Sequence, residues 1–341
     1  MAEQSDRASR PAGEDRVRLE DVRKAAATLA GVAHRTPVLT STRLDRQAGC
    51  RLYLKAENLQ RSGSFKFRGA YNRLAALSAG GRRAGVVAFS SGNHGQALAL
   101  AGQLLGVPVS VLMASDSPRV KQRAAVGYGA TVQFYGPDGD RHALAVQAAA
   151  QRNAVFVHPY EDPVVIAGQG TAALELLEDV SDLDTLVVPI GGGGLISGCA
   201  VAAKGLNPAI RVIGVEPAAG NDTYLSVAAG RRVSIGLPGT IADGLRTRSP
   251  GERAYQMITE LVDEVVLVSE AEIMAAVTTL ALTAKTVTEP SGAVSAAAVL
   301  AGRVTGRRVG VILSGGNVDP GRLARIIHSG AEAAEEKMSE P

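Results

Sequence analysis

Short apolar runs alternate with alanine-rich stretches along most of this chain. The runs have the length and β-branched content of strands, and several are apolar at almost every position, as in strands buried on both faces of a parallel sheet. The runs are RLYLKAE (51–57), GVVAFS (85–90), VPVSVLM (107–113), ATVQFY (130–135), AVFVH (154–158), TLVVPI (185–190), RVIGVEP (211–217), EVVLVS (264–269) and RVGVILS (308–314). The stretches between them predict helices at 92–106, 118–129, 140–152, 168–180, 269–285 and 291–302. The alternation predicts an α/β fold of doubly wound parallel sheets, which bind ligands at the carboxyl ends of their strands.

The pattern has neither a repeat of fixed period nor a long linker, so we expect two α/β units in close contact. Residues 1–16 are polar and contain proline and glycine, which predicts a disordered N-terminal tail. Residues 331–341 predict a frayed acidic tail.

The composition excludes several classes of protein. Of the 341 residues, 46% are apolar and 20% are charged, which is enough to build a large globular core. The 36 Lys and Arg residues nearly balance the 33 Asp and Glu residues, so we expect no nucleic-acid partner and no attraction to an anionic membrane. No apolar run reaches the ~20 residues of a membrane span. Cys50 and Cys199 form no paired motif and the N-terminus lacks an apolar signal segment, so we expect a cytoplasmic protein.

Four consecutive glycines, 191–194, follow the predicted strand 185–190 and precede a helical stretch. Backbone N–H groups in such a loop, together with the positive end of the helix, suit a phosphate. The alternative explanation is a tight turn, but one or two glycines would be enough for a turn. The spacing fits neither a dinucleotide fingerprint nor a Walker loop, which needs Gly-Lys-Ser/Thr. The loop therefore predicts a phosphate site.

Two further loops of small polar residues also follow predicted strands, SSGNH at 90–94 and SGGN at 314–317. Hydroxyl groups and free N–H groups at the start of a helix suit an anion such as a carboxylate. The alternative at 90–94 is a helix N-cap, which needs only one such residue. Because the carboxyl ends of parallel strands meet at one edge of a sheet, we expect these loops to converge on one crevice.

Lys66 lies between Phe65 and Phe67, next to small residues and a predicted helix start. Most lysines are surface charges, and that is the alternative here. A lysine held among apolar side chains has a lowered pKa and can form an imine with an aldehyde. An imine-forming lysine together with a phosphate site predicts pyridoxal 5'-phosphate as the cofactor.

Taken together, these motifs resemble those of the fold type II (tryptophan synthase β-like) pyridoxal-phosphate enzymes, in particular their serine/threonine dehydratase and serine racemase branch. The motifs that carry the resemblance occur in the family's order and span residues ~20–325. They are SGSFKFRGA, SSGNHGQALA, VIAGQGTAALE, VVPIGGGGL, GVEP, TIADGL and LSGGN.

The resemblance implies the domain organisation and the assembly. It implies a large cofactor-binding domain formed by residues 17–84 and 163–330, and a small substrate-gating domain formed by residues 85–162. Both are doubly wound α/β domains, with the cofactor in the cleft between them. It also implies a homodimer and a small-molecule amino-acid substrate.

The family's cofactor-binding positions are matched one by one. Lys66 would hold pyridoxal phosphate through its amine and then act as the base on the substrate Cα, while Phe65 would pack near the cofactor ring. Asn93 would hydrogen-bond the phenolic oxygen of the ring, and Ser314 would face its nitrogen. A neutral hydroxyl at Ser314 leaves that nitrogen largely unprotonated, which favours prompt β-elimination over a long-lived carbanion. The phosphate would be bound by Gly191, Gly192, Gly193 and Gly194.

The substrate-binding positions follow in the same way. Ser90, Asn93 and His94 would hold the substrate carboxylate. Arg141 matches an arginine of the racemases that contacts a carboxylate, although the surrounding loop GPDGDRH differs from theirs. Ser91 matches the serine that racemases use on the face opposite the lysine, and two bases on opposite faces of a planar carbanion are what racemisation needs.

A cation site is also implied, in GVEPAAGND. The racemase-like enzymes bind a divalent cation through residues that correspond here to Glu216, the backbone carbonyl of Gly220, and Asp222. Oxygen ligands of this kind suit Mg²⁺ or Ca²⁺. The alternative is an ordinary acidic loop.

The implied activity is β-elimination from a β-hydroxy L-amino acid such as L-threonine or L-serine, which releases a 2-oxo acid and ammonia. Serine racemase and 3-hydroxyaspartate dehydratase are the alternatives within the branch. A non-enzymatic binding protein on the same fold is a further alternative, but a protein that only binds has no need of an imine-forming lysine.

Overall fold

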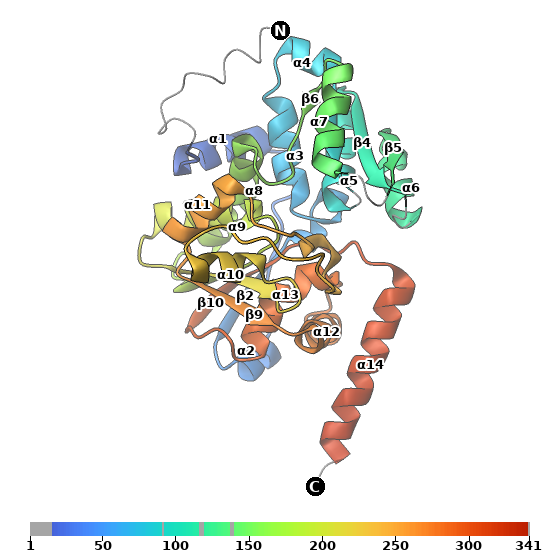
Figure 1. Cartoon of the computed structure of the whole chain (residues 1–341). Helices are drawn as coiled ribbons and strands as arrows, with labels where there is room; N and C mark the ends of the chain where they lie inside the picture. The colour runs from blue at the N-terminus through green and yellow to red at the C-terminus, as the bar shows by residue number, and fades with distance from the viewer. Residues whose placement is uncertain (1–15, 91, 116–118, 137–139, 340–341) are drawn as a thin grey trace.

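The computed structural model describes residues 16–90, 92–115, 119–136 and 140–339, and these form two β-sheets (Figure 1). The larger sheet has the order β1-β2-β10-β7-β8-β9, in which only the pair β1 and β2 is antiparallel. Its strands are β1 (Val38–Leu39), β2 (Arg51–Ala56), β7 (Thr185–Pro189), β8 (Arg211–Pro217), β9 (Glu264–Val268) and β10 (Arg308–Leu313). The smaller sheet has the parallel order β5-β4-β3-β6. Its strands are β3 (Val86–Phe89), β4 (Val109–Ala114), β5 (Thr131–Tyr135) and β6 (Val155–Phe156).

Each predicted apolar run forms a strand, and the α/β fold with doubly wound parallel sheets is confirmed. The helices expected between the runs also form. Strand β1 was not predicted, because it is only two residues long and lies at the edge of the larger sheet.

Helices cover both faces of the larger sheet and create two apolar cores. One face carries α1 (Leu19–Leu29), α8 (Pro163–Asp179), α9 (Gly194–Leu206) and α11 (Glu252–Leu261). The other carries α2 (Thr42–Ala48), α12 (Glu270–Thr279) and α13 (Pro290–Leu300). Strand β7 serves both cores, since Leu186 and Val188 enter the first and Val187 enters the second. This two-residue alternation explains why the strand is apolar on both faces from Leu186 to Val188.

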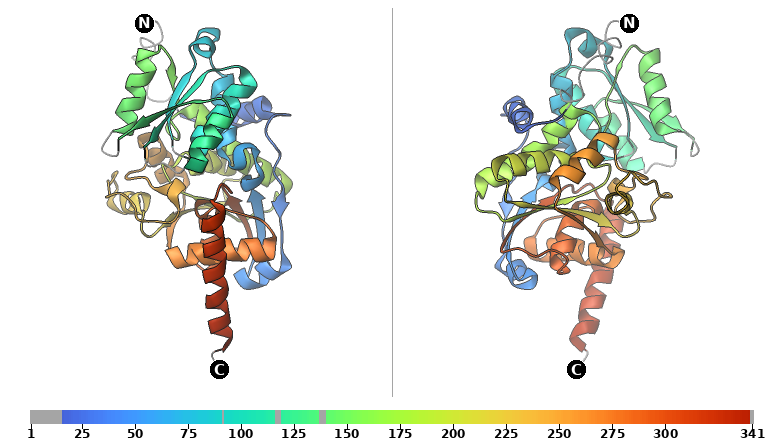
Figure 2. Two further views of the ribbon diagram at one scale, coloured as in Figure 1. Left: turned by 90° about the vertical axis from the view of Figure 1, so that its right-hand side faces the viewer. Right: turned by 60° about the vertical axis from the view of Figure 1, so that its left-hand side comes forward.

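The smaller sheet is covered in the same way (Figure 2). Helices α3 (Lys66–Ala75) and α5 (Asn93–Leu105) pack on one face and α7 (Arg141–Gln151) on the other. The remaining helices are α4 (Ala79–Ala84), α6 (Arg119–Gly127), α10 (Asp222–Ala229) and α14 (Pro320–Ser339). Short helical turns lie at Glu57–Leu59, Arg61–Gly63, Asp243–Leu245 and Leu280–Ala284.

Helix α3 begins at Lys66 and contacts helices of both sheets, α5 on one side and α8 on the other. It has no side-chain cap at its N-terminus. Instead, the side chain of Gln169 on α8 accepts a hydrogen bond from the N–H of Gly69 at 3.0 Å. The first turn is therefore held by a tertiary contact in addition to local main-chain bonds, such as that from the N–H of Arg68 to the carbonyl oxygen of Phe65 at 3.0 Å.

A buried ion-pair network fixes the same helix. The guanidinium of Arg68, which is fully buried, donates to Glu57 at 2.7 Å and to Glu175 at 2.7 Å. Lys55, also fully buried, donates to Glu175 at 2.6 Å and to the carbonyl oxygen of Thr36 at 2.7 Å. The network joins α3 to the end of β2 and to α8, and it balances two buried cations with two carboxylates.

Helix α14 extends away from the body of the molecule (Figures 1 and 2). It continues to Ser339, so residues 331–339 are helical where a frayed acidic tail was predicted. Alanine and glutamate are strong helix formers, and they dominate this segment. In the described part of the chain, no helix is both long enough and apolar enough to cross a membrane.

Replacing Arg68 tests the buried network. We expect Arg68→Met to lower the free energy of unfolding by about 3–5 kcal/mol, because it leaves the fully buried Glu57 without its cation and leaves Glu175 with Lys55 alone. Urea titration followed by circular dichroism measures this loss. Arg35→Met is the control, because the Arg35 side chain is 52% exposed in its ion pairs with Glu178 and Asp179, and its loss should cost at most about 1 kcal/mol. Equal losses in the two variants would contradict the role given to the network.

Candidate active site

Lys66 lies where the two sheets meet, at the N-terminus of α3. Its Nζ donates a hydrogen bond to the carbonyl oxygen of Pro159 at 2.9 Å and lies 5.0 Å from the centre of the Phe65 ring. Burial of the amine lowers the pKa of Lys66 to about 8. No carboxylate pairs with the amine in the described part of the chain. The amine is therefore uncharged in a useful fraction of molecules at neutral pH, as imine chemistry requires.

The lysine loop is joined to the loop that follows β10. Ser64 and Gly315 form an isolated β-bridge, and the N–H of Phe65 donates to the carbonyl oxygen of Ser314 at 3.1 Å. The Nδ2 of Asn317 donates to the carbonyl oxygen of Ser62 at 2.7 Å. Ser62 has a left-handed backbone, with φ of 57°, which is unusual for a residue with a side chain. The structure thus brings two of the sequence-predicted loops into direct contact.

Asn93 adds the third loop to this junction. Its Oδ1 accepts a hydrogen bond from Asn317 at 2.9 Å, and its Nδ2 donates to the carboxylate of Glu289. Glu289 is buried, and its N–H donates to the carbonyl oxygen of Gly315 at 3.1 Å. The sequence analysis missed Glu289, because a lone acid before a proline carries no pattern that predicts a site.

His94 is buried, with 3% exposure. Its Nε2 lies 3.5 Å from the carbonyl oxygen of Val157. Burial, and then the charge of Lys66, lower the pKa of His94 well below its usual value, so the ring is neutral. The expected contact of His94 with a substrate carboxylate stays a prediction.

The N-terminus of α5 is open to an anion. Gly92 at the N-cap position provides no side-chain hydrogen bond, so the first N–H groups of the helix have no capping side chain. The Oγ of Ser90 accepts from the N–H of Gly92 at 3.2 Å, which stabilises the turn before the helix. Ser91 lies outside the described residues.

The glycine loop lies against Tyr160. A Cβ at Gly192 would come within 2.4 Å of the Tyr160 ring, and one at Gly194 would come within 2.8 Å of its backbone. Gly193 adopts φ of 94° and precedes α9 without a capping side chain. Protein neighbours therefore explain two of the glycines that the sequence analysis attributed to a ligand. The uncapped N-terminus of α9 still provides the free N–H groups that suit a phosphate.

Ser314 follows β10 and is 4% exposed, and its Oγ donates to the carbonyl oxygen of Ser291 at 3.4 Å. The hydroxyl groups of Ser62 and Ser64, on the lysine loop, are buried without a hydrogen-bond partner in the described part of the structure. Such groups are costly unless a ligand or water satisfies them. A desolvated lysine, unsatisfied hydroxyls and an uncapped helix together fit pyridoxal phosphate.

An aromatic cluster joins Arg141 to this junction. The guanidinium of Arg141 lies 5.2 Å from the centre of the Phe89 ring, and Phe89 packs edge-on against His158. The Nδ1 of His158 accepts from the N–H groups of Tyr160 at 3.3 Å and Glu161 at 3.1 Å. Burial, and then the charges of neighbouring cations, lower the pKa of His158 to about 3, so its ring is neutral. The segment HPYED was missed by the sequence analysis, although it directly follows a predicted strand.

The residues proposed to bind a cation lie together at the start of α10. The carboxylate of Glu216 accepts from the N–H groups of Thr223 at 3.0 Å and Tyr224 at 2.8 Å. Burial, and then the charge of Asp222, raise the pKa of Glu216 to about 8; burial raises that of Asp222 to about 7. No group of three His, Cys, Asp or Glu side chains able to hold a metal occurs in the described residues. A cation here would thus have two carboxylates and main-chain oxygen as protein ligands.

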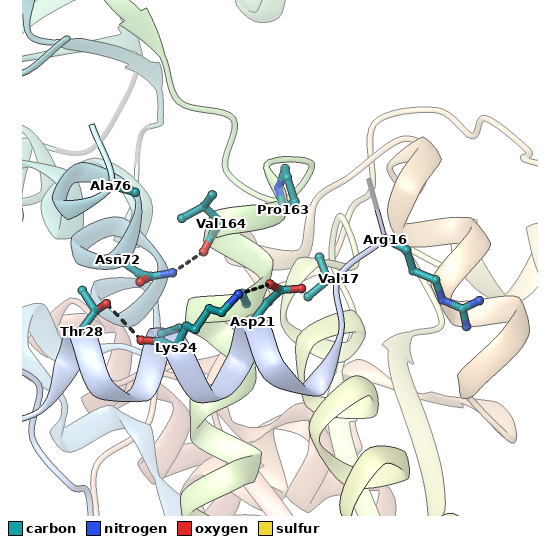
Figure 3. A pocket seen from close by; sticks show the side chains of 11 residues that line it. Arg16, Val17, Asp21, Lys24, Thr28, Asn72, Ala76, Pro163 and Val164 are labelled. Carbon is teal, nitrogen blue, oxygen red and sulfur yellow. Dashed lines mark hydrogen bonds and ion pairs between the residues drawn. The ribbon is translucent and has the colours of Figure 1, made fainter. Parts of the chain in front are cut away.

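A separate depression of about 350 Å³ lies between α1, α3 and α8 (Figure 3). Asn72, whose Nδ2 donates to the carbonyl oxygen of Val164 at 2.8 Å, lies on one of its walls. None of the predicted site residues lines it.

Comparison with known proteins agrees with this geometry. A family described as "Pyridoxal-phosphate dependent enzyme" matches residues 29–315. L-threo-3-hydroxyaspartate ammonia-lyase of Saccharomyces cerevisiae is 46% identical over 92% of this chain and 96% of its own length. L-threonine ammonia-lyase of Thermotoga maritima is 44% identical over 92% of this chain and 79% of its own length.

Among solved structures, that of maize serine racemase superposes with a TM-score of 0.88 at 38% identity, covering 94% of this chain and 99% of the maize chain. The resemblance found in the sequence is therefore confirmed. The lysine, the glycine loop and the strand-end loops of the chain have the order and arrangement described above. The chain belongs to the family of pyridoxal-phosphate dependent enzymes.

Proposed function

We propose that this protein catalyses β-elimination from a β-hydroxy L-amino acid, such as L-threonine or L-serine, to give a 2-oxo acid and ammonia. The observation that carries the proposal is the position of Lys66, a desolvated amine at the junction of the three strand-end loops. Similarity to ammonia-lyases over nearly the whole chain supports it.

The same contacts support a division of roles between the two sheets. We infer a large cofactor-binding domain, residues 17–84 and 163–330, around the six-stranded sheet. Residues 85–162, which hold the four-stranded sheet, would form the small substrate-gating domain. Asn93, on the smaller unit, contacts Glu289 and Asn317 of the larger one, so the site spans both.

Bound pyridoxal phosphate supplies an electron sink for the charge left at Cα when a proton is removed. The N–H groups of the glycine loop and of α9 would bind its phosphate. Lys66 would bind its aldehyde carbon, Phe65 would pack near its ring, and Asn93 would hydrogen-bond its phenolic oxygen. Ser314 would face the ring nitrogen as a neutral partner.

The protein's part in the reaction begins with orientation of the substrate. The uncapped N-terminus of α5, with Ser90 in the preceding turn, would hold the substrate carboxylate. The amine of Lys66 would take the proton from Cα, because its lowered pKa leaves it unprotonated in part of the population. Loss of the β-hydroxyl as water and hydrolysis of the product then give the 2-oxo acid and ammonia.

Racemisation is the second reaction that this site supports, because Ser91 occupies the sequence position of the second base in the racemase branch. Similarity to maize serine racemase agrees with this alternative. The products distinguish the reactions, since elimination gives a 2-oxo acid and racemisation gives the D-amino acid.

Replacement of Lys66 tests the proposed function. We expect purified holoenzyme to release 2-oxo acid from L-threonine, L-serine or 3-hydroxyaspartate, and Lys66→Ala to lower the rate at least about 10²–10⁴-fold, the usual contribution of a positioned base. Chromatography measures the 2-oxo acid and any D-isomer in the same samples. Lys24→Ala is the control, since the side chain of Lys24 is 81% exposed and far from the loop junction in sequence. Full activity in Lys66→Ala would refute the role of this lysine.

The lowered pKa of Lys66 predicts a pH dependence for cofactor capture. Only the neutral amine attacks an aldehyde, so the rate should rise about tenfold per pH unit below pH 8 and level off above it. An unshifted lysine would continue to gain up to its usual pKa, above 10. Stopped-flow absorbance after mixing apoenzyme with pyridoxal phosphate measures the profile. A rate that continues to climb through pH 10 would contradict a desolvated Lys66.

The cation site is tested by thermal unfolding. We expect Mg²⁺ or Ca²⁺ at 100 times its dissociation constant to stabilise the holoenzyme by about 2.7 kcal/mol. The shift in melting temperature should disappear in Asp222→Asn, which removes one carboxylate ligand, and in excess chelator. Asp182→Asn is the matched control, since the side chain of Asp182 is 65% exposed. A shift of the same size in Asp222→Asn would place the cation elsewhere.

A further inference from the structure

Helix α8 packs against both helices whose first turns form the proposed cofactor site (Figure 1). One of them, α3, begins at Lys66, and the other, α9, begins at Gly194 in the glycine loop. The motif VIAGQGTAALE, residues 165–175, lies within α8. The sequence analysis used this motif only to recognise the family and gave it no function. Because α8 contacts both helices, its packing sets where the lysine lies relative to the phosphate loop.

Two glycines of this motif, Gly168 and Gly170, lie on opposite sides of α8. Successive residues of a helix are turned by ~100°, so residues two positions apart point in nearly opposite directions. On one side, a Cβ at Gly168 would come within 2.6 Å of the Cα of Gly69 on α3. On the other side, a Cβ at Gly170 would come within 2.6 Å of the carbonyl oxygen of Gly198 on α9. Helix α8 therefore meets each neighbour through main-chain atoms, as glycine allows.

Both contacts lie about one turn from the helix ends that carry the site. Gly69 comes three residues after Lys66, and Gly198 comes four residues after Gly194. A contact between main-chain atoms holds a distance firmly, because no change of rotamer can absorb a displacement. The width of α8 at its two glycines thus fixes the separation of the two helix starts.

Gln169, between the two glycines, adds a directional contact with α3. Its side chain is 1% exposed, and its Oε1 accepts a hydrogen bond from the N–H of Gly69 at 3.0 Å. Its Nε2 has no hydrogen-bond partner in the described part of the chain. A buried amide with an unsatisfied donor is costly. The one hydrogen bond that this side chain makes therefore runs to the first turn of the lysine helix.

Other contacts join α3 to α8 beyond that first turn. The Nδ2 of Asn72 donates to the carbonyl oxygen of Val164 at 2.8 Å, and Arg73 forms an ion pair with Asp162 at 2.7 Å. These contacts do not involve Gln169. We therefore expect the two helices to stay packed together when Gln169 is replaced, while the first turn of α3 becomes less firmly placed.

The cofactor of this family makes a geometric demand on the two helix starts. The aldehyde and the phosphate of pyridoxal phosphate are attached to one rigid ring, so the groups that receive them must lie at a matching separation. When the neutral amine of Lys66 attacks the aldehyde carbon, a C=N bond forms, and the aldehyde oxygen leaves as water with two protons. This step requires the amine to lie in place while the glycine loop holds the phosphate.

We propose that Gln169, with Gly168 and Gly170 beside it, is a positioning residue that sets the lysine helix at the distance from the phosphate loop that this cofactor requires. The inference rests on the proposed function, because it uses the roles given there to Lys66 and the glycine loop, and it deepens that function. Gln169 acts through the main chain of α3 and not through contact with the reacting atoms.

Two ligands of apoenzyme separate position from stability. Pyridoxal phosphate is bound at both ends, whereas 4'-deoxypyridoxine phosphate has the ring and the phosphate but a methyl group in place of the aldehyde, so it forms no imine. Calorimetric titration gives both dissociation constants. We expect Gln169→Met, which has a similar length but no strong acceptor, to raise the constant for pyridoxal phosphate and to leave that for the analogue as in the wild type.

The size of the effect follows from the fraction of molecules in which the lysine is in place. The dissociation constant rises as that fraction falls, and loss of one hydrogen bond lowers the fraction by up to about tenfold. The ratio of the two constants should therefore rise by up to about tenfold in Gln169→Met. Gln169→Glu keeps an acceptor oxygen at the same reach and loses only the nitrogen that has no partner, so it should restore most of the ratio.

Glycine variants supply a matched control. Gly168→Ala forces α8 away from α3 and should raise the ratio as Gln169→Met does. Gly102→Ala crowds α5 to the same degree, since a Cβ there would come within 2.6 Å of the carbonyl oxygen of Val107. It lies outside the contacts of α8 with α3 and α9, so it should lower the free energy of unfolding, measured by urea titration, without changing the ratio.

An unchanged ratio in Gln169→Met, or the same rise of both constants, would make Gln169 a residue of general stability and overturn the proposal. A rise of the ratio in Gly102→Ala equal to that in Gly168→Ala would overturn it as well. If Gln169→Met does not fold, Gln169→Asn takes its place, because it withdraws the acceptor by one methylene and should raise the ratio in the same direction.

The two proposals fail in different ways. If wild-type holoenzyme releases no 2-oxo acid from any of the hydroxy amino acids, the proposed function fails, and the ratio of dissociation constants still measures the role of Gln169. If threonine is converted but the ratio in Gln169→Met equals that of the wild type, the positioning role fails and the proposed function stands.

Discussion

The buried ion pairs of Arg68 hold the helix on which the chemistry depends. Helix α3 starts at Lys66 without a capping side chain, so contacts with distant segments add to the local main-chain bonds of its first turn. Arg68, two residues further on, is paired with Glu57 after β2 and with Glu175 on α8. A lysine at the first position of a helix held in this way keeps a defined place in the cleft. The cost of burying four charges is offset only because every partner is present.

The second constraint is the neutrality of the groups around the amine. His94 and His158 are both uncharged because burial opposes their protonation, and the charge of Lys66 opposes it further. In the described residues the rings beside the amine are neutral and no carboxylate pairs with it, so its charged form has the hydrogen bond to the carbonyl oxygen of Pro159 but no ion pair. The surroundings therefore favour a lysine that acts as nucleophile and base rather than one that forms an ion pair.

The glycine loop shows how one sequence feature can serve two purposes. Gly192 and Gly194 leave room for Tyr160, and Gly193 makes the turn into α9. The N–H groups at the start of α9 remain free because no side chain caps them. The same short segment can thus pack against the tyrosine and also bind a phosphate. The loop also carries the main-chain bond between the N–H of Gly251 and the carbonyl oxygen of Gly192.

The sequence by itself determined the fold class and the succession of strands along the chain, and its motifs predicted site residues such as Lys66 and the four glycines. Apolar periodicity and glycine-rich strand ends are local properties, so they can be recognised without coordinates. Only the tertiary structure decided which distant groups meet. Glu289 and Tyr160 carry no local pattern, and their place beside the predicted loops comes from packing between segments far apart in the chain. The same packing buried the side chain of His94, which the sequence pattern alone does not reveal.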